Sequence, residues 1–374
     1  MIVVRLERRV ATPRWIGVAV PVGSVFAALV LAGVFFVLTD RPPLTVYSEM
    51  FDAAFGDVQG VKNTLVSATP LVFTGLAAAF AMRMGLYNIG GEGQLYAGAI
   101  AAAGAALLWT ADLSTPIAIA VVFVAGAVGG MAWMLVPALA RALLGTSEIV
   151  TTLMMVLVAD VVLDYLISGS TSYWRDPLTI GFPQGKEIPD AAQFTRWFDA
   201  RITVALPIAI VTAAIVWFVR NRTSFGYGQD VIGDAPHAAR YAGISERRTV
   251  LVTLLVSGAL AGMAGAAEIG GRIYKLEPSS LRLGLGFTGI VIAALARSNA
   301  LGVLVAAFFL GGLRNAGQSV QAVADLDLPK SVALMLEGFI LLCFLGGQVF
   351  STHRLRIVRR EPARRARASA GASS

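Results

Sequence analysis

The chain has 374 residues, of which 56% are hydrophobic and only 14% are charged, and its mean hydropathy is +0.72. About a quarter of the residues of an average soluble domain are charged, so this composition excludes a soluble globular protein and indicates an integral membrane protein. The formal net charge of +7 does not indicate a partner nucleic acid, because the basic residues are confined to short loops and tails between apolar runs.

Ten apolar runs are long enough to be considered as membrane-spanning helices. The first follows several arginines but is longer than the apolar core of a secretory signal, so we expect it to remain as a helix. The ten runs cover residues 15–38, 61–82, 92–109, 116–140, 149–167, 202–219, 250–270, 283–296, 301–314 and 331–350. The fold class predicted is an all-α, polytopic membrane helix bundle of about ten segments with discontinuous helices. The two short runs at 283–314 leave open a single re-entrant pair.

Charge distribution predicts the orientation. With the N-terminus inside, ten crossings place the arginine-rich loops and both termini in the cytoplasm and the acidic segment 39–60 outside. The chain then divides into a basic cytoplasmic N-terminus (1–14), a transmembrane domain (15–350) with a cytoplasmic loop at 220–248, and an Arg-rich tail (351–374) that contacts anionic lipid headgroups. The outer loop 168–201 is either a lid over the helix ends or a docking surface.

Two glycine-rich breaks interrupt the apolar pattern. The first runs from Gly85 to Gln94 and the second from Gly284 to Gly289. Irregular backbone at membrane depth is tolerated only where protein buries it or where it lines a watery cavity. Broken segments at corresponding places in two halves of a transporter also indicate a central site. We therefore expect the solute pathway to lie between the two breaks.

Five residues at the breaks are candidates for the pathway: Tyr87, Asn88, Glu92, Gln94 and Phe287. An ionisable residue inside the membrane is a functional hypothesis by default, which singles out Glu92. The aromatic rings can stack on a flat solute while the amides bond to its edge. The alternative is structural: the amides satisfy freed backbone groups, Glu92 caps the third helix, and the aromatic rings are ordinary core.

The loop at 220–248 contains a candidate short helix. Asp234 can cap it, Pro236 fits its first turn and Gly243 can end it. Ala238, Tyr241 and Ala242 would then share one face. The helix either receives force from a cytoplasmic partner or is an ordinary surface helix.

Enzymatic function is not expected. No phosphate-binding loop with its lysine occurs, so ATP would have to bind another chain. The two histidines, His237 and His353, both lie in predicted cytoplasmic segments, which leaves no basis for an intramembrane zinc site or a Ser-His site. Cys343 lies alone in an apolar run.

Four segments in one order carry a resemblance to a known family: 85–94, 147–154, 233–244 followed by 257–262, and 285–290. They resemble the permease subunits of bacterial ABC importers of the ribose, branched-chain amino acid and nucleoside branch. Within it the chain is most similar to the nucleoside importers that work with basic-membrane-protein-type binding proteins. Two departures are Ala235 and Val156, where the family usually has Asn.

The resemblance implies a complex in the bacterial cytoplasmic membrane. Its other members are two ATPase subunits that bind ATP and Mg, a second permease chain, identical or homologous, and an extracytoplasmic solute-binding protein; no cofactor is expected in this chain. The loop would contain the coupling helix that contacts the ATPase, with its contacts at Asp234, Pro236, Ala239, Arg240, Tyr241 and Gly243.

The function predicted is the movement of a nucleoside by alternating access, driven by ATP on separate subunits. One alternative is an importer of a simple sugar such as ribose. Another is a secondary transporter or channel that needs no ATPase.

Overall fold

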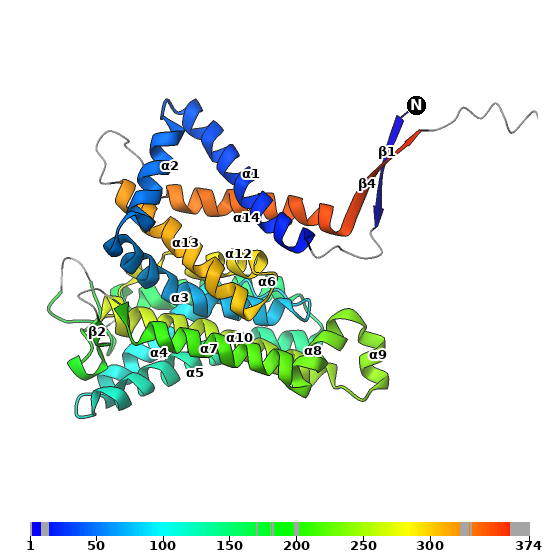
Figure 1. Cartoon of the computed structure of the whole chain (residues 1–374). Coiled ribbons are helices and arrows are strands. Elements are labelled where there is room, and N and C mark those ends of the chain that lie inside the picture. Colours follow the sequence, from blue (N-terminus) through cyan, green and yellow to red (C-terminus); the bar gives the residue numbers. More distant parts are fainter. Residues whose placement is uncertain are drawn as a thin grey trace, which may run out of the picture. The chain divides into compact units, whose positions relative to one another are not determined.

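A computed structural model describes residues 2–8, 15–169, 171–179, 181, 183–197, 202–321, 329 and 331–359. Helices dominate this part of the chain, which confirms the all-α fold class (Figure 1). Residues 33–337 form a larger unit, and residues 1–32 and 338–374 form a smaller one.

Four helices form the centre of the larger unit: α3 (Val58–Met82), α4 (Gly91–Trp109), α5 (Thr115–Leu144) and α10 (Glu246–Glu268). Helix α10 packs against the other three (Figure 1). The packing brings backbones together, since a Cβ on Gly98 or Gly130 would overlap the backbone of Gly262. Helices in lipid associate through such van der Waals contacts, so the small-residue runs produce a tight bundle.

Helices α6 (Glu148–Asp164), α7 (Ala205–Arg222), α12 (Leu285–Leu295) and α13 (Ala300–Val320) pack around this centre. Helix α13 packs against α3 and continues to Val320, so the expected run 301–314 is too short. Helix α12 has only 11 residues, or about 16 Å, and therefore covers about half of a membrane. A π-turn (Ile269–Ile273) and α11 (Pro278–Leu281) connect α10 to it.

Each of the ten expected runs coincides with a helix. Among the described residues, eight helices are long and apolar enough to cross a membrane, and a shorter apolar helix covers Val332–Gln348 of α14 (Val332–Thr352). Helix α4 is outside these groups because its first turn carries Glu92 and Gln94. The chain is therefore a multi-pass membrane protein.

Two segments expected to be loops are helical. The segment 39–60 contains α2 (Pro43–Phe51) and a π-turn (Asp52–Gly56), and the loop 220–248 contains α8 (Ser224–Asp234) before α9 (Pro236–Tyr241). The segment that forms α8 contains several glycines, a composition typical of a loop. Its helix is stabilised by the Thr223 side chain, which accepts the amide of Gly226, and by burial of Gln229 and Ile232.

The segment after α6 packs on neighbouring helix ends. It contains a π-turn (Tyr165–Gly169), a 3-10 turn (Asp190–Ala192) and a strand pair of β2 (Arg196–Trp197) with β3 (Ile202–Thr203). Trp174 donates to the carbonyl of Ile100 at 3.0 Å, and Phe194 stacks on Phe123 with ring centroids 5.1 Å apart. These contacts place the segment against α4 and α5.

The smaller unit contains residues 16–32 of α1 (Ile16–Leu38) and residues 338–352 of α14. The Ser24 hydroxyl bonds to the carbonyls of Val20 and Cys343. Strand β1 (Ile2–Arg8) pairs antiparallel with β4 (His353–Arg359). This pairing was not predicted from the sequence, where the two chain ends were treated as separate tails. Residues 360–374 of the predicted tail lie outside the described residues.

Candidate functional site

The two glycine-rich breaks meet inside the larger unit. Helix α3 ends at Met82, Gly85 has a φ of 73°, and helix α4 begins at Gly91. Gly284, with a φ of 69°, precedes α12. A Cβ on Gly286 would overlap the backbone nitrogen of Glu92, so this close approach requires glycine.

Glu92 joins the two breaks. Its Oε2 accepts the Gly286 amide at 2.6 Å, and its Oε1 accepts the Gly284 amide and the Tyr96 hydroxyl, both at 2.9 Å. The carboxylate is buried and uses both oxygens as acceptors. Glu92 lies in the first turn of α4, where its charge was expected to interact with the helix dipole, and its carboxylate also accepts two backbone amides at the start of α12.

Asn88 and Gln94 form a reciprocal amide pair under the first break. Asn88 Nδ2 donates to Gln94 Oε1 at 2.8 Å, and Gln94 Nε2 donates to Asn88 Oδ1 at 2.9 Å. Asn88 also donates to Ser257 Oγ, whose hydroxyl donates to the Ala77 carbonyl at 2.6 Å, and Asn88 Oδ1 accepts the amide of Gly90. The two amides thus tie α3, α4 and α10 together.

The two candidate aromatic residues lie at the surface of the larger unit. Tyr87 and Phe287 are each nearly half exposed. The Tyr87 amide donates to Glu148 Oε1 at 3.2 Å, which fixes the first break to the start of α6. Phe287 is on the first turn of α12, where its immediate neighbours Gly286 and Thr288 are buried. Neither ring is ordinary core, and stacking on a solute stays a prediction.

A buried ion pair, absent from the sequence-based candidates, holds the second break. Arg314 of α13 pairs with Glu337 of α14 at 2.9 Å, and both side chains are largely buried. Arg314 also donates to the Leu283 carbonyl at 2.9 Å and to the Thr288 hydroxyl at 2.8 Å, while Thr288 donates to Glu337. The start of α12 is therefore clamped by charged groups on both sides. We call these contacts, together with those of Glu92, the break clamp.

A second ion-pair group, also missed, connects the break to α6. Arg282, two residues before Gly284, donates to Asp160 at 2.6 Å and to Asp164 at 2.5 Å. The two aspartates are one turn apart on α6 and share a face. The rule that singled out Glu92 also applies to them, because Asp160, Asp164 and Arg282 all lie in apolar candidate spans.

The short helix α9 differs in detail from the expectation. Its N-cap is Ala235, because Asp234 is the last residue of α8 and cannot cap the next helix. Pro236 occupies the first turn and Gly243 follows the helix with a φ of 73°, as predicted.

The face of α9 that was expected to carry Ala238, Tyr241 and Ala242 is exposed. Ala239 is buried, whereas Ala238, Tyr241 and Ala242 are exposed. Arg240 pairs with Glu246 at 3.7 Å, an exposed pair. Tyr241 is 96% exposed, so its ring is available to a partner.

Helix α8 contacts the first break. Asp230 pairs with Arg83, which donates from Nη2 to Asp230 Oδ2 at 2.7 Å, and Gly233 packs on the backbone of Arg83 and Met84. The hydrogen bond to Asp230 raises the pKa of Arg83 above its ordinary value. Arg83 immediately follows α3, so the contact lies two residues before Gly85, where the first break begins.

Helix α7, which leads into α8, contacts the turn that follows α12. Arg220 donates to the carbonyl of Ser298, in the turn between α12 and α13. Arg297 and Ser298 adopt left-handed φ values of 50° and 57°, a conformation that costs free energy in residues with a Cβ. The α7–α8 segment therefore contacts the chain just after α3, at Arg83, and just after α12, at Ser298.

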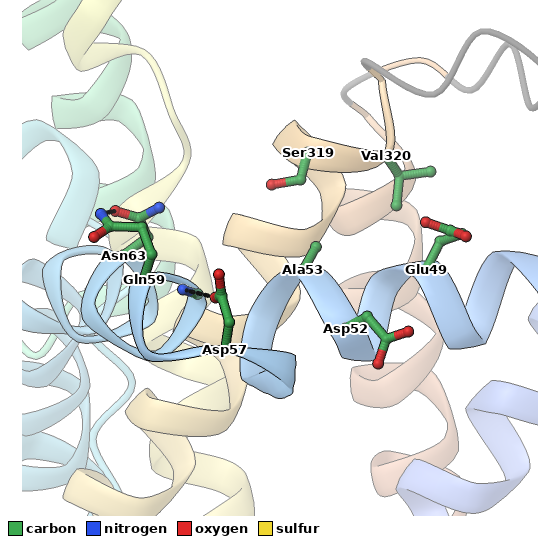
Figure 2. Close-up of a pocket in the computed structure, with 9 residues that line it drawn as sticks. Glu49, Asp52, Ala53, Asp57, Gln59, Asn63, Ser319 and Val320 are labelled. Atoms are coloured by element: carbon green, nitrogen blue, oxygen red, sulfur yellow. Dashed lines mark hydrogen bonds between the residues drawn. The ribbon is translucent and has the colours of Figure 1, made fainter.

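A polar cavity of about 310 Å³ lies at the opposite end of α3 from Arg83 (Figure 2). Its walls come from α2, the π-turn after it, the start of α3 and the end of α13. The lining residues are Glu49, Asp52, Ala53, Asp57, Gln59, Gly60, Asn63, Ser319 and Val320. By the predicted orientation this acidic cavity opens to the outside, and it lies away from the break clamp.

Comparison with known proteins identifies the fold. Residues 60–345 match the family model described as the permease component of a branched-chain amino acid transport system. The chain belongs to this permease family. The comparison with solved structures finds no match.

Three relatives show which solutes occur among similar proteins. The permease is 33% identical to the guanosine ABC transporter permease protein NupP of Bacillus subtilis, over 79% of this chain and 84% of the relative. It is 31% identical to the nucleoside permease protein NupB of Lactococcus lactis (79% and 83%). It is also 30% identical to the glucose permease protein TsgB13 of Haloferax volcanii, over 94% and 93%.

Proposed function

We propose that this permease is the translocating subunit of an ATP-driven importer that moves a nucleoside across the cytoplasmic membrane by alternating access. The observation that carries the proposal is the break clamp, which bonds the start of α4 to the start of α12, together with the contacts of the α7–α8 segment with Arg83 after α3 and with Ser298 after α12. Membership of the ABC permease family supports the proposal independently.

The clamp is proposed to be the closed gate of the pathway. Glu92, Arg314 and Glu337 hold the start of α12 against α4, α13 and α14 through hydrogen bonds that cannot all persist if α12 moves. Packed elements change between discrete arrangements and are not continuously deformable. Displacement of α12 from Glu92 would open a path beside Tyr87 and Phe287.

Force for this movement is proposed to come from ATPase subunits that contact α9. The exposed Tyr241 ring is a suitable anchor, because aromatic residues are frequent at the centre of interfaces. Motion of α9 and α8 would pull on Arg83 at the first break and, through Arg220, on the turn that follows the second break. ATP and Mg would bind the partner ATPase, and this chain would hold no cofactor.

A second permease chain, identical or homologous, and an extracytoplasmic binding protein complete the proposed assembly. Both termini of this chain would be cytoplasmic. Selection of the solute can reside in the binding protein, so the pathway needs only a weak site that releases what it admits.

A nucleoside is preferred as the solute because two relatives at 31–33% identity carry guanosine or nucleoside in their names. The glucose permease relative, which matches over 94% of this chain, supports a sugar as the second candidate.

Uptake competition distinguishes the two candidates. Cells that contain the complete importer are given labelled guanosine or adenosine together with excess unlabelled guanosine, ribose or leucine. The proposal expects competition by the nucleoside alone. Competition by ribose, with no saturable nucleoside uptake, would contradict the nucleoside assignment in favour of the sugar.

A further inference from the structure

Three charged side chains lie exposed at a depth where lipid cannot accept them. In the triad of Asp160, Asp164 and Arg282 the side chains are 40%, 48% and 37% exposed, although all three belong to apolar candidate spans. Asp160 is 12 residues, or about 18 Å, from the start of α6, and Asp164 is about 24 Å from it. Ionisable groups within a membrane span face a water-filled cavity or protein, not hydrocarbon.

The hydrogen bonding of the triad is incomplete. Arg282 donates from Nε to Oδ1 of Asp160 and from Nη2 to Oδ2 of Asp164. The other oxygen of each carboxylate has no donor among the described residues, and Arg282 Nη1 has no acceptor there. Two acceptors and one donor therefore remain free in the triad, whose formal net charge is −1.

We propose that this triad lines the solute pathway and recognises two neighbouring hydroxyl groups of the solute. Two adjacent O–H groups can each donate to one of the free carboxylate oxygens, and one hydroxyl oxygen can accept from Arg282. Hydrogen bonds to charged groups are the stronger ones. The net negative charge disfavours phosphorylated solutes, so the site suits a neutral ribose-bearing compound.

The position of the triad supports this role. Arg282 is two residues from Gly284, whose amide is bonded to Glu92, so the triad and the break clamp hold opposite sides of one short segment. A solute that draws the carboxylates away from Arg282 would loosen α6 from the start of α12. This inference rests on the proposed importer function and adds the residues that contact the solute.

Thiol accessibility in the assembled complex tests whether the triad faces water. Cys343 is first replaced by Ala, and Asp160→Cys or Asp164→Cys is then treated with a charged, membrane-impermeant thiol reagent. Val158→Cys is the matched control: Val158 is 48% exposed at a similar depth but about 160° around α6 from Asp160. The proposal expects labelling at residues 160 and 164 and none at 158. Equal labelling, or none at any position, would overturn it.

The ratio of the uptake rates of a ribonucleoside and its 2′-deoxy analogue tests whether the triad recognises neighbouring hydroxyl groups. Proteoliposomes that contain the complete importer are assayed with a ribonucleoside and its 2′-deoxy analogue, each saturating the binding protein. Asp160→Asn should reduce the ratio of the two uptake rates about tenfold, the scale of one charge-assisted hydrogen bond. An unchanged ratio, even at a reduced rate, would overturn the inference. Failure of the wild-type importer to transport any nucleoside would instead contradict the proposed function.

Discussion

Replacement of Glu92 by Gln tests the break clamp most sharply. The carboxylate accepts three hydrogen bonds, from Gly284, Gly286 and Tyr96. A glutamine retains one oxygen, and its amide group would point a donor at a backbone N–H donor. At least one bond to a charged acceptor is lost and one buried amide is left without a partner, so we expect Glu92→Gln to destabilise the closed state by about 2 kcal/mol.

The assay is the thermal midpoint of the purified complex together with nucleoside uptake. Tyr96→Phe is the matched control, because it removes one donor and leaves both backbone amides bonded to the carboxylate. We expect Glu92→Gln to lower the midpoint well below that of Tyr96→Phe and to reduce uptake about tenfold or more while the subunits still assemble. A thermal midpoint and an uptake rate equal to those of the wild type in Glu92→Gln would show that the hydrogen bonds of Glu92 do not stabilise the break clamp.

Three further predictions concern the contacts around the clamp. Arg83→Asp breaks the ion pair that joins α8 to the first break. We expect ATP hydrolysis to continue while uptake in proteoliposomes falls about tenfold, and we expect the added change Asp230→Arg to restore uptake. Arg314→Met leaves the buried Glu337 carboxylate unpaired and lowers the free energy of unfolding by about 3–5 kcal/mol, as measured by denaturant titration. Gly286→Ala places a methyl group on the backbone of Glu92 and lowers both thermal stability and uptake.

Each of these has a control and a contradicting result. Arg83→Asp with unimpaired uptake would show that α8 does not transmit force through this pair. The double change of Arg314 and Glu337 to Met should cost less than Arg314→Met alone, and an equal cost would argue against a buried unpaired charge. Gly338→Ala, where a Cβ meets nothing within 4 Å, should be neutral; a loss as large as that of Gly286→Ala would make the latter uninformative about the clamp.

Local patterns were enough to predict the membrane runs and the two breaks. Apolar length and the clusters of glycine at 85–93 and 284–289 are readable without knowledge of neighbours in space. The meeting of the breaks was also predictable, because broken segments in two halves of a transporter usually converge. The bonds of Glu92 to the second break could not be predicted, since Gly284 and Gly286 are 192 and 194 residues away in the sequence.

The ion pairs were missed for a related reason. Arg314 stood at the end of an apolar run that was taken to stop there, so it resembled a loop residue, whereas α13 continues to Val320. Glu337, Asp160 and Asp164 lay inside runs whose hydropathy remained high. A systematic list of ionisable residues in apolar runs would have found them, although not which acid pairs with which base.

The cytoplasmic loop shows a different limit. Asp234 has the side chain of a cap and precedes Pro236, which made it a reasonable N-cap for α9. The preceding residues form α8, however, and Asp234 is its last residue, so Ala235 takes the cap position. Glycine-rich composition hid a helix that is stabilised by contacts with residues distant in the sequence, such as Arg83.

A comparison of uptake with and without the partner ATPase tests directly whether this permease is part of an ATP-driven importer. Cells that contain this permease, its partner permease and its binding protein are compared with and without the ATPase subunit, using labelled guanosine. An ATP-driven importer coupled through α9 and α8 predicts saturable uptake only when the ATPase is present and able to hydrolyse ATP. Robust uptake in its absence would show that the chain is a self-sufficient secondary transporter or channel, and would contradict the account.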